Sequence, residues 1–296
     1  MGMKSGTCGC ALAVLFATTM FGADLQKDLN GMAAQHAGKV ALYAKNLKTG
    51  ATVAVNADEP VQTASVIKLP VMIEAFYEAA AGKVQLEERL KLAKENQVPG
   101  SGVLAQLQPG LEPTLGDAIT LMIIISDNTA TNMVLDRIGI PPVNARIAYM
   151  VIKNTYLDKK VFTPAEGPMP ADQKKFGLGK TTAREMAEVM ESILRCDLKN
   201  EGLCARMLAI LRAQQDQSMI PRYITTGEKG LAASIGDKVG KLDAVRNDVA
   251  LVTTKAGPIV ISIFTWENKD QRWTPDNEAE ILIGRMAKRV VDEWTQ

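Results

Sequence analysis

A serine and a lysine three residues apart, Ser65 and Lys68, could form an acyl-transfer site. Residues at this spacing share one face of a helix, so the two side chains would be neighbours. A serine hydroxyl needs a base to remove its proton, and a lysine can act as that base when burial lowers its pKa. A helix N-terminus at Ser65 would add positive potential where negative charge develops. The same spacing also occurs at ordinary helix starts, so it indicates catalysis only together with other motifs.

A second polar motif, Ser126-Asp127-Asn128, comes directly after the apolar run at 121–125. A polar triplet at the end of a hydrophobic element can project into a cleft. In the simpler interpretation, Asp127 or Asn128 only caps the helix that starts near Thr129.

A third motif, Lys238-Val239-Gly240, lies on a late strand-like run, where it could equally be a strand residue followed by a bulge. Ser-x-x-Lys, Ser-Asp-Asn and Lys-Thr-Gly, in this chain order, are the motif set of class A β-lactamases and penicillin-binding proteins. The chain therefore resembles a class A serine β-lactamase, or a relative in the wider penicillin-binding superfamily. The resemblance covers nearly all of residues 24–296.

This resemblance implies a role for each motif residue that could take part in bond making. Ser65 would be the acylated nucleophile, and Lys68 would accept its proton directly or through water. Ser126 would relay a proton to the leaving nitrogen. Lys238 would keep the field of the cleft positive and help to hold a substrate carboxylate.

The resemblance also implies how the substrate is held. Asn128 would hydrogen-bond the amide side chain of the substrate, and the strand around Val239 and Gly240 would line the cleft. The oxyanion hole would use the backbone N–H groups of Ser65 and Lys241. These donors belong to the backbone and do not depend on a side chain. Removing one such donor in other enzymes costs about 3 kcal/mol, so their contribution to catalysis is large.

The third motif departs from the family at its middle position. The usual threonine or serine helps to bind the substrate carboxylate, and Val239 has the shape but lacks the hydroxyl. One hydrogen bond to a charged acceptor is worth roughly 1.5 to 3 kcal/mol, so affinity could fall about ten- to a hundredfold. Arg246 is the candidate to compensate, because a guanidinium binds carboxylates in bidentate fashion.

A second departure concerns the residue that activates the deacylating water. Class A enzymes have a glutamate in a Glu-Pro-x-x-Asn setting, and the run 155–158 aligns Val161 with that position. Glu166 lies five residues further on, and its simpler interpretation is a solvated loop carboxylate. General-base assistance is commonly worth about 10² to 10⁴ in rate, so its absence would prolong the acyl-enzyme.

Three functions remain open on these grounds. The first is a β-lactamase with an altered deacylation apparatus. The second is a D-Ala-D-Ala peptidase or penicillin-binding protein that acylates readily and releases penicillin slowly. The third is a non-catalytic homologue that binds a cell-wall ligand or partner. In each case the ligand would be a β-lactam or a peptidoglycan stem.

The composition excludes several other classes. The chain has 296 residues, 47% of them hydrophobic, which is ordinary for a globular protein. Its 34 Lys and Arg against 33 Asp and Glu leave no positive surplus for a nucleic-acid backbone. A single histidine, His36, makes a Ser-His-Asp triad or a His-rich metal site improbable. We expect no metal, no cofactor and no nucleic-acid partner, and we expect a monomer.

The residue patterns predict an α+β fold, an α/β three-layer sandwich in which terminal helices flank one five-stranded antiparallel sheet. Residues 24–60 and 215–296 would form the sheet lobe of the catalytic domain, and 61–214 a mostly helical lobe. Strand-like runs are Lys39–Ala44, Ala51–Val55, Ala232–Val239, Val245–Thr253 and Pro258–Trp266. Helical patterns are Asp24–His36, Val66–Ala81, Leu115–Ile125, Thr129–Ile138, Thr182–Leu194, Cys204–Gln214 and Asn277–Trp294.

The N-terminus and the cysteines indicate export. Residues 1–23 have one charge, an apolar run too short to span a bilayer and a small-residue end, which is typical of a signal peptide. Cleavage would leave a secreted or periplasmic chain without a membrane segment. Cys196 and Cys204 bracket a polar link between two helical patterns, and in an oxidising compartment they could form a disulfide.

Overall fold

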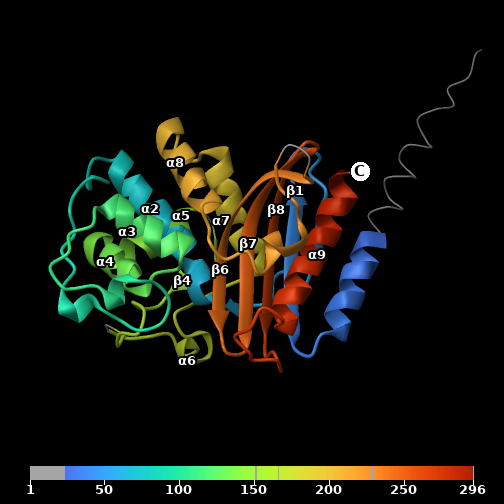
Figure 1. The fold of residues 1–296 in the computed structure, drawn as a ribbon, viewed down its shortest axis with the longest axis horizontal. Coiled ribbons are helices and arrows are strands. Elements are labelled where there is room, and N and C mark those ends of the chain that lie inside the picture. Colours follow the sequence, from blue (N-terminus) through green and yellow to red (C-terminus); the bar gives the residue numbers. More distant parts are fainter. Residues whose placement is uncertain (1–23, 151, 166, 228–229, 296) are drawn as a thin grey trace, which may run out of the picture.

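The computed structural model describes residues 24–150, 152–165, 167–227 and 230–295. The predicted signal peptide over 1–23 and the candidate Glu166 lie outside the described residues. Figure 1 shows a group of helices on one side of the molecule and a sheet backed by two long helices on the other.

Five antiparallel strands form the main sheet, in the order β2-β1-β8-β7-β6. They are β1 (Lys39–Asn46), β2 (Thr52–Val55), β6 (Ala232–Leu242), β7 (Val245–Thr254) and β8 (Gly257–Trp266). β1 pairs with β8 along its full length, so segments from the two ends of the chain lie side by side. The predicted single five-stranded antiparallel sheet is confirmed.

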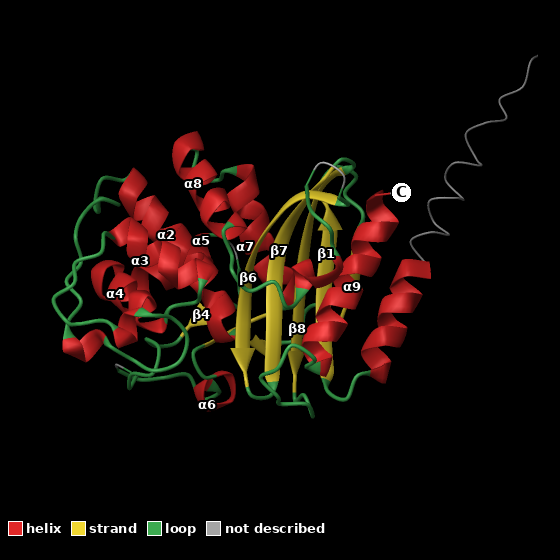
Figure 2. Ribbon diagram, in the orientation of Figure 1, coloured by secondary structure: helices red, strands yellow, loops and turns green. Residues whose placement is uncertain are grey.

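Helices cover both faces of this sheet (Figure 2). The longer helices are α2 (Lys68–Ala80), α3 (Leu115–Ile124), α4 (Asn128–Ile138), α5 (Ile140–Tyr149), α7 (Ala183–Arg195), α8 (Glu201–Arg212) and α9 (Glu278–Thr295). The shorter ones are α6 (Gln173–Phe176), η1 (Ala64–Ile67), η2 (Lys94–Asn96), η3 (Leu104–Gln106) and η4 (Ile220–Tyr223). Because both faces are covered, β8 is buried continuously from Ile259 to Thr265 instead of alternating.

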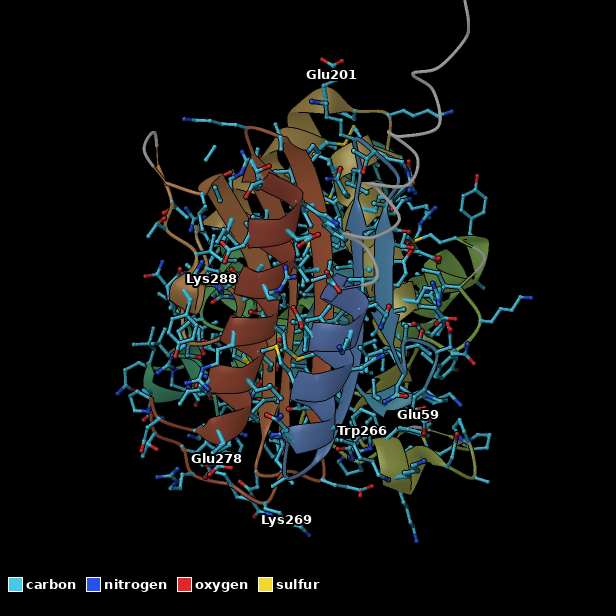
Figure 3. All side chains as sticks on the ribbon, turned by 90° about the vertical axis from the view of Figure 1, so that its right-hand side faces the viewer. Glu59, Glu201, Trp266, Lys269, Glu278 and Lys288 are labelled. Carbon is cyan, nitrogen blue, oxygen red and sulfur yellow. A yellow bond between two sulfur atoms is a disulfide. The ribbon has the colours of Figure 1, made fainter. Side chains whose placement is uncertain are left out.

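The terminal helices cover one face of the sheet, as predicted. The helix at 24–35 and α9 lie side by side across it (Figure 3). Leu29 of the first helix and Val290 of α9 are fully buried in one hydrophobic cluster with side chains of the strands. An ion pair between Asp28 and Arg289 of 2.9 Å joins the two helices at the surface.

α2 is the central helix of the helical lobe and contacts α3, α4, α5, α7 and α8. Every residue from Lys68 to Phe76 is buried, which explains why this run is apolar on all faces except at Lys68 and Glu74. The first residue of this helix, Lys68, is therefore deep inside the molecule, where a charge is costly.

A second, three-stranded sheet was not predicted. It has the order β3-β5-β4 and consists of β3 (Val61–Gln62), β4 (Tyr156–Leu157) and β5 (Gly179–Thr181). Strands this short have no sequence periodicity to detect. The small sheet fixes the chain just before η1, because Thr63 donates from both its backbone N–H and its hydroxyl to the Gly179 carbonyl.

The predicted disulfide between Cys196 and Cys204 is present and closes the link between α7 and α8. Replacing both cysteines with serine should lower the free energy of unfolding by roughly 2.5 kcal/mol, the chain-entropy value for so short a loop. Urea unfolding of the wild type and of the double variant measures this difference.

Reductant supplies the control for this prediction. It should destabilise the wild type by the same amount and leave the double serine variant unchanged. A wild type whose unfolding midpoint does not move, although thiol titration shows complete reduction, would contradict the prediction.

Among the described residues, no helix combines the length and the apolar composition that crossing a membrane requires.

Candidate active site

Ser65 lies in η1, the turn that runs directly into α2. Ala64 before it has a φ of +44°, a left-handed conformation that is strained for a residue with a side chain. Bonds on both sides hold this turn, because Asn247 of β7 donates to the Thr63 carbonyl and Thr63 is itself tied to Gly179. Ser65 is half-buried and lines two cavities of about 520 and 530 Å³.

Lys68 is the first residue of α2 and is fully buried. Its Nζ donates to the Ser126 carbonyl at 2.8 Å, to Ser126 Oγ at 3.2 Å and to Asn128 Oδ1 at 2.9 Å. Burial lowers the pKa of Lys68 well below its usual range, and the nearby charge of Lys238 lowers it further. The amine is therefore far easier to deprotonate than an exposed lysine.

Ser126 lies between α3 and α4 with a φ of +56°, again in the left-handed region. This conformation lets its carbonyl and its hydroxyl both face the buried Lys68 amine. Its Oγ also accepts a hydrogen bond of 3.1 Å from Lys238 Nζ, so it lies between two lysines. The three side chains form one connected group beside the cavities that Ser65 lines.

The other two residues of the second motif, Asp127 and Asn128, have different positions: one caps a helix and the other lines a cavity. Asp127 caps α4 by accepting from the Ala130 N–H at 2.8 Å, as the simpler interpretation expected. Its second oxygen accepts from the N–H groups of Val103 and Leu104. Asn128 lines the larger cavity together with Ser65, and its amide donates to the Pro99 carbonyl.

The strand β6, which carries Lys238 and Gly240, packs against η1. Lys238 is fully buried, and burial lowers its pKa to about 8 although nearby aspartates oppose the shift. A Cβ on Gly240 would come within 2.8 Å of the Thr63 carbonyl and 3.1 Å of the Ser65 nitrogen. A glycine is thus required here for the strand to approach Ser65.

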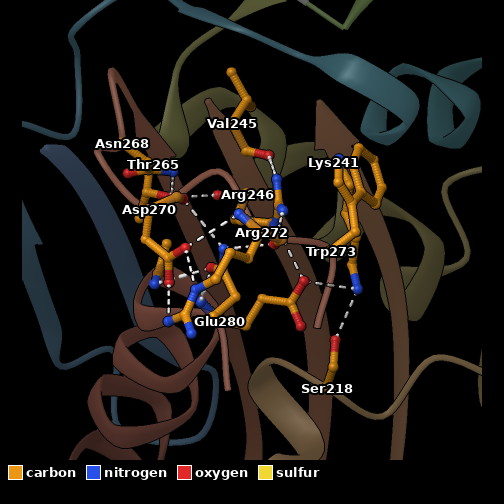
Figure 4. Close-up of polar contacts among 12 residues, drawn as sticks. Ser218, Lys241, Val245, Arg246, Thr265, Asn268, Asp270, Arg272, Trp273 and Glu280 are labelled. Carbon is orange, nitrogen blue, oxygen red and sulfur yellow. Dashed lines mark hydrogen bonds and ion pairs between the residues drawn. The ribbon is translucent and has the colours of Figure 1, made fainter. Parts of the chain in front are cut away.

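Arg246 does not lie where the sequence analysis expected it. Its guanidinium is fully buried and donates to Glu280 at 3.0 Å, to the Arg272 carbonyl at 2.8 Å and to the carbonyls of Leu242 and Val245. Figure 4 shows these contacts within the cluster around β7 and α9. Its donors are committed inside the protein, so the expectation that Arg246 compensates for Val239 is corrected.

Lys241 is the neighbouring cation that does reach the cleft. Its Nζ lies 2.7 Å from Asp216. It also lies 2.9 Å from Ser218 Oγ and 3.0 Å from Glu280, which it shares with Arg246 (Figure 4). Lys241 lines both cavities that contain Ser65, and Val239 lines one of them.

Val161 lies in the wall of the larger cavity and is buried. Asn132 of α4 fixes its backbone in both directions, accepting from the Val161 N–H and donating to its carbonyl, each at 2.9 Å. These two bonds fix the backbone at position 161, so its apolar side chain is held in the cavity wall. Glu166 lies outside the described residues.

The sequence analysis missed the aromatic walls of this cavity. Phe162 is 63% exposed and Trp273 is 61% exposed, yet both line the cavity that holds Ser65. Neither follows a periodic pattern, and Trp273 belongs to a loop, so no sequence signal marked them. The cavity thus combines the polar side chains of Ser65 and Asn128 and the charged Lys159 and Lys241 with apolar walls.

Comparisons with known proteins agree with this geometry. Residues 24–294 match the family described as "Beta-lactamase enzyme family". A β-lactamase of Streptomyces fradiae is 24% identical over 295 residues, which covers 93% of this chain and 87% of the relative.

Solved structures agree in fold. A β-lactamase of Sphaerobacter thermophilus is 30% identical, with a TM-score of 0.77 over 92% of this chain and 96% of that one. A leucine-to-glutamate variant of PBP-A, solved as an acyl-enzyme complex with penicillin G, is 26% identical. Its TM-score is 0.79, over 91% of this chain and 96% of that one.

The match over nearly the whole described chain agrees with a cavity lined by Ser65 and Ser126, the second of which contacts both buried lysines. The chain belongs to the beta-lactamase enzyme family and is a serine β-lactamase-type hydrolase.

Proposed function

We propose that this hydrolase is acylated by β-lactams at Ser65 and releases the acyl group slowly, as a penicillin-binding protein does. The observation that carries the slow release is Val161, a buried apolar side chain in the cavity wall. A carboxylate at that position would activate water, and valine cannot accept a proton.

Acylation would begin with attack of Ser65 Oγ on the lactam carbonyl carbon. Lys68 takes the hydroxyl proton, and the lowering of its pKa by burial makes the neutral amine that this step needs easier to form. The C–N bond of the ring then breaks, and a proton passes through Ser126 to the leaving nitrogen. The contacts of Ser126 Oγ with both Lys68 and Lys238 support this relay.

Backbone N–H groups of Ser65 and Lys241 would stabilise the oxyanion. The close approach of β6 to η1, which Gly240 allows, supports this assignment. Such donors are effective because they are fixed before the reaction begins.

Lys238 and Lys241 would hold the substrate carboxylate in place of a hydroxyl at position 239. Lys241 supports this role because it lines both cavities, whereas Arg246 is committed elsewhere. The three donors of the Lys241 ammonium group are bound to Asp216, Ser218 and Glu280, so a direct hydrogen bond to the substrate carboxylate would displace one of these partners.

A D-Ala-D-Ala peptidase is the second candidate function. Val161 favours it, because an enzyme that uses a peptide stem gains nothing from rapid hydrolysis of penicillin. PBP-A, the penicillin-binding protein with similar fold, supports the same view. The assembled group of Lys68, Ser126 and Lys238 argues against a non-catalytic homologue, because burying two lysines side by side is costly without a function.

Intact-mass measurement combined with a chromogenic cephalosporin tests the proposal. We expect a persistent adduct of one acyl group on the wild type, slow colour after a single turnover, and no adduct on Ser65→Ala. Rapid colour without an adduct would show efficient turnover and overturn the slow release. The absence of both colour and adduct would overturn acylation by β-lactams.

The aromatic walls favour β-lactams with an apolar acyl side chain. Replacing Phe162 with serine should lower the acylation rate constant for a benzyl-substituted penicillin about tenfold, the value of one aromatic contact. A penicillin without an aromatic side chain should be unaffected. Stopped-flow or quenched intact-mass kinetics measures both rates.

Tyr149→Ser is the matched control, because Tyr149 is an aromatic residue that is 77% exposed and lines a different cavity. It should leave both rates unchanged. Equal losses for the two penicillins in Phe162→Ser would instead mean that the substitution disturbs the site as a whole.

We also propose that the mature protein is a monomer in the periplasm or outside the cell. The disulfide between Cys196 and Cys204 supports an oxidising compartment, because such bonds persist there.

A further inference from the structure

Two aspartates that the proposed chemistry does not use, Asp237 and Asp248, lie buried behind the site. Asp237 is 1% exposed and Asp248 is fully buried. Asp248 pairs in register with Val239, and Asp237 precedes Val239 by two residues. The two side chains therefore lie on the same face of β6 and β7, within hydrogen-bonding reach of each other. Lys238, between Asp237 and Val239, points to the opposite face of β6.

One oxygen of each carboxyl group in this pair lacks a hydrogen-bond donor in the described part of the chain. Asp248 Oδ2 accepts from the Ile220 N–H of η4 at 2.9 Å. Asp248 Oδ1 and Asp237 Oδ2 are buried and have no donor among the described residues. Two ionised carboxylates in this arrangement would repel each other and leave both oxygens unsatisfied. One proton between these oxygens removes both penalties.

We propose that Asp237 and Asp248 share a single proton, and that the one negative charge they keep stabilises the charged form of Lys238 through the sheet. They act as positioning residues, because neither reaches the cavities that Ser65 lines. Burial raises the pKa of both carboxyl groups above the usual range, which agrees with a retained proton. Carboxyl pairs in other proteins share a proton for the same reason.

The surrounding charges determine what the pair does. Asp216 and the cations Lys238 and Lys241 act on the pair through their charges, Lys238 from the opposite face of β6. Glu280 of α9 is neutralised by Arg246 and Lys241. The pair therefore supplies a negative charge that offsets the burial of Lys238. Without that charge the pKa of Lys238 would fall, and Lys238 would lose its proton near neutral pH.

Asparagine variants separate a shared proton from two charges. Asp237→Asn and Asp248→Asn each replace one carboxyl with a neutral group of the same shape, so each keeps the single negative charge. Each should leave the alkaline limb of the acylation rate within a few tenths of a pH unit of the wild type. The double variant Asp237→Asn/Asp248→Asn loses the charge, and its alkaline limb should move on the order of one unit toward lower pH.

Two kinetic outcomes would overturn the proposal. A shift in each single variant that is about half the shift of the double variant would show two ionised aspartates. An unshifted double variant, folded by circular dichroism, would show that the pair does not act on Lys238. The use of Lys238 in acylation rests on the proposed function, so this arm requires that β-lactams acylate the wild type.

Infrared difference spectroscopy tests the proton independently of any β-lactam. At about pH 6, where ordinary aspartates are ionised, the wild type minus either single variant should show one protonated carboxyl band. Other carboxyl groups cancel in the difference. Absence of this band would overturn the shared proton even if acylation proceeds as proposed. If the band is present but β-lactams do not acylate the protein, the shared proton stands and only the proposed function is refuted.

Discussion

Replacing Lys68 with methionine should lower the rate constant for acylation of Ser65 by about 10² to 10⁴, the usual contribution of a general base. Methionine fills a similar volume but cannot accept the hydroxyl proton. The loss should appear in the acylation step itself, measured as adduct formation by quenched intact-mass kinetics with a penicillin. The substrate affinity should change much less than the rate, because Lys68 donates to Ser126 and Asn128 rather than to the cavity.

Lys68→Arg is the control that separates a base from a charge. Arginine keeps a cation and its donors but does not give up its proton in proteins. We expect it to be as slow as Lys68→Met. Acylation by Lys68→Arg at a rate close to that of the wild type would show that position 68 contributes charge only.

The pH dependence provides a second measure of the same base. Lys68 must be neutral to accept a proton, so the rate should rise as the pH passes its lowered pKa. Lys238 must be charged, so the rate should fall again above its pKa of about 8. The wild type should thus give a bell-shaped profile. In Lys68→Met the acidic limb should disappear while the alkaline limb remains.

Replacing Val161 with glutamate should raise the rate of deacylation by about 10² to 10⁴ and convert a persistent adduct into turnover. The bonds that Asn132 makes to position 161 involve only its backbone, so they survive the substitution. The new carboxylate would lie in the cavity wall that contains Ser65 and Lys159. A lysine near a buried carboxylate helps to keep it ionised, as a base requires. Decay of the adduct, followed by intact mass after removal of excess penicillin, measures the rate.

Val161→Gln is the matched control, because glutamine has the shape of glutamate but no proton-accepting carboxylate. It should deacylate as slowly as the wild type. Equal acceleration by Gln and Glu would show that shape or hydration limits deacylation. A wild type that already deacylates rapidly would show that another group supplies the base.

Local features of the site were predictable because short spacing and periodicity encode them. Ser65 and Lys68 are three residues apart, so any helix brings them together. The link between Cys196 and Cys204 is equally short. The five strand-like runs were recognisable from their β-branched residues, and the sheet contains all five. The cap by Asp127 also followed from its place before α4.

Features that depend on several elements at once were predictable only in part. Motif order suggested that Ser126 and Lys238 belong with Lys68. Ser126 lies 58 residues after Lys68 and 112 residues before Lys238 in the chain. Position along β7 suggested a binding role for Arg246, whereas Glu280 of α9 binds it inside the protein. The sequence contains no sign of which partner a buried guanidinium meets.

The sequence alone thus predicted the disulfide and the five strands, which the structure contains, and it named Ser65 and Lys68 as the candidate nucleophile and base, because each of these follows from residues close together in the chain. Only the tertiary structure decided that the Lys241 side chain lines the cleft while Arg246 binds inside the protein, and that Asp237 meets Asp248. The physical reason is that buried polar groups require partners, and those partners come from distant segments that packing brings together.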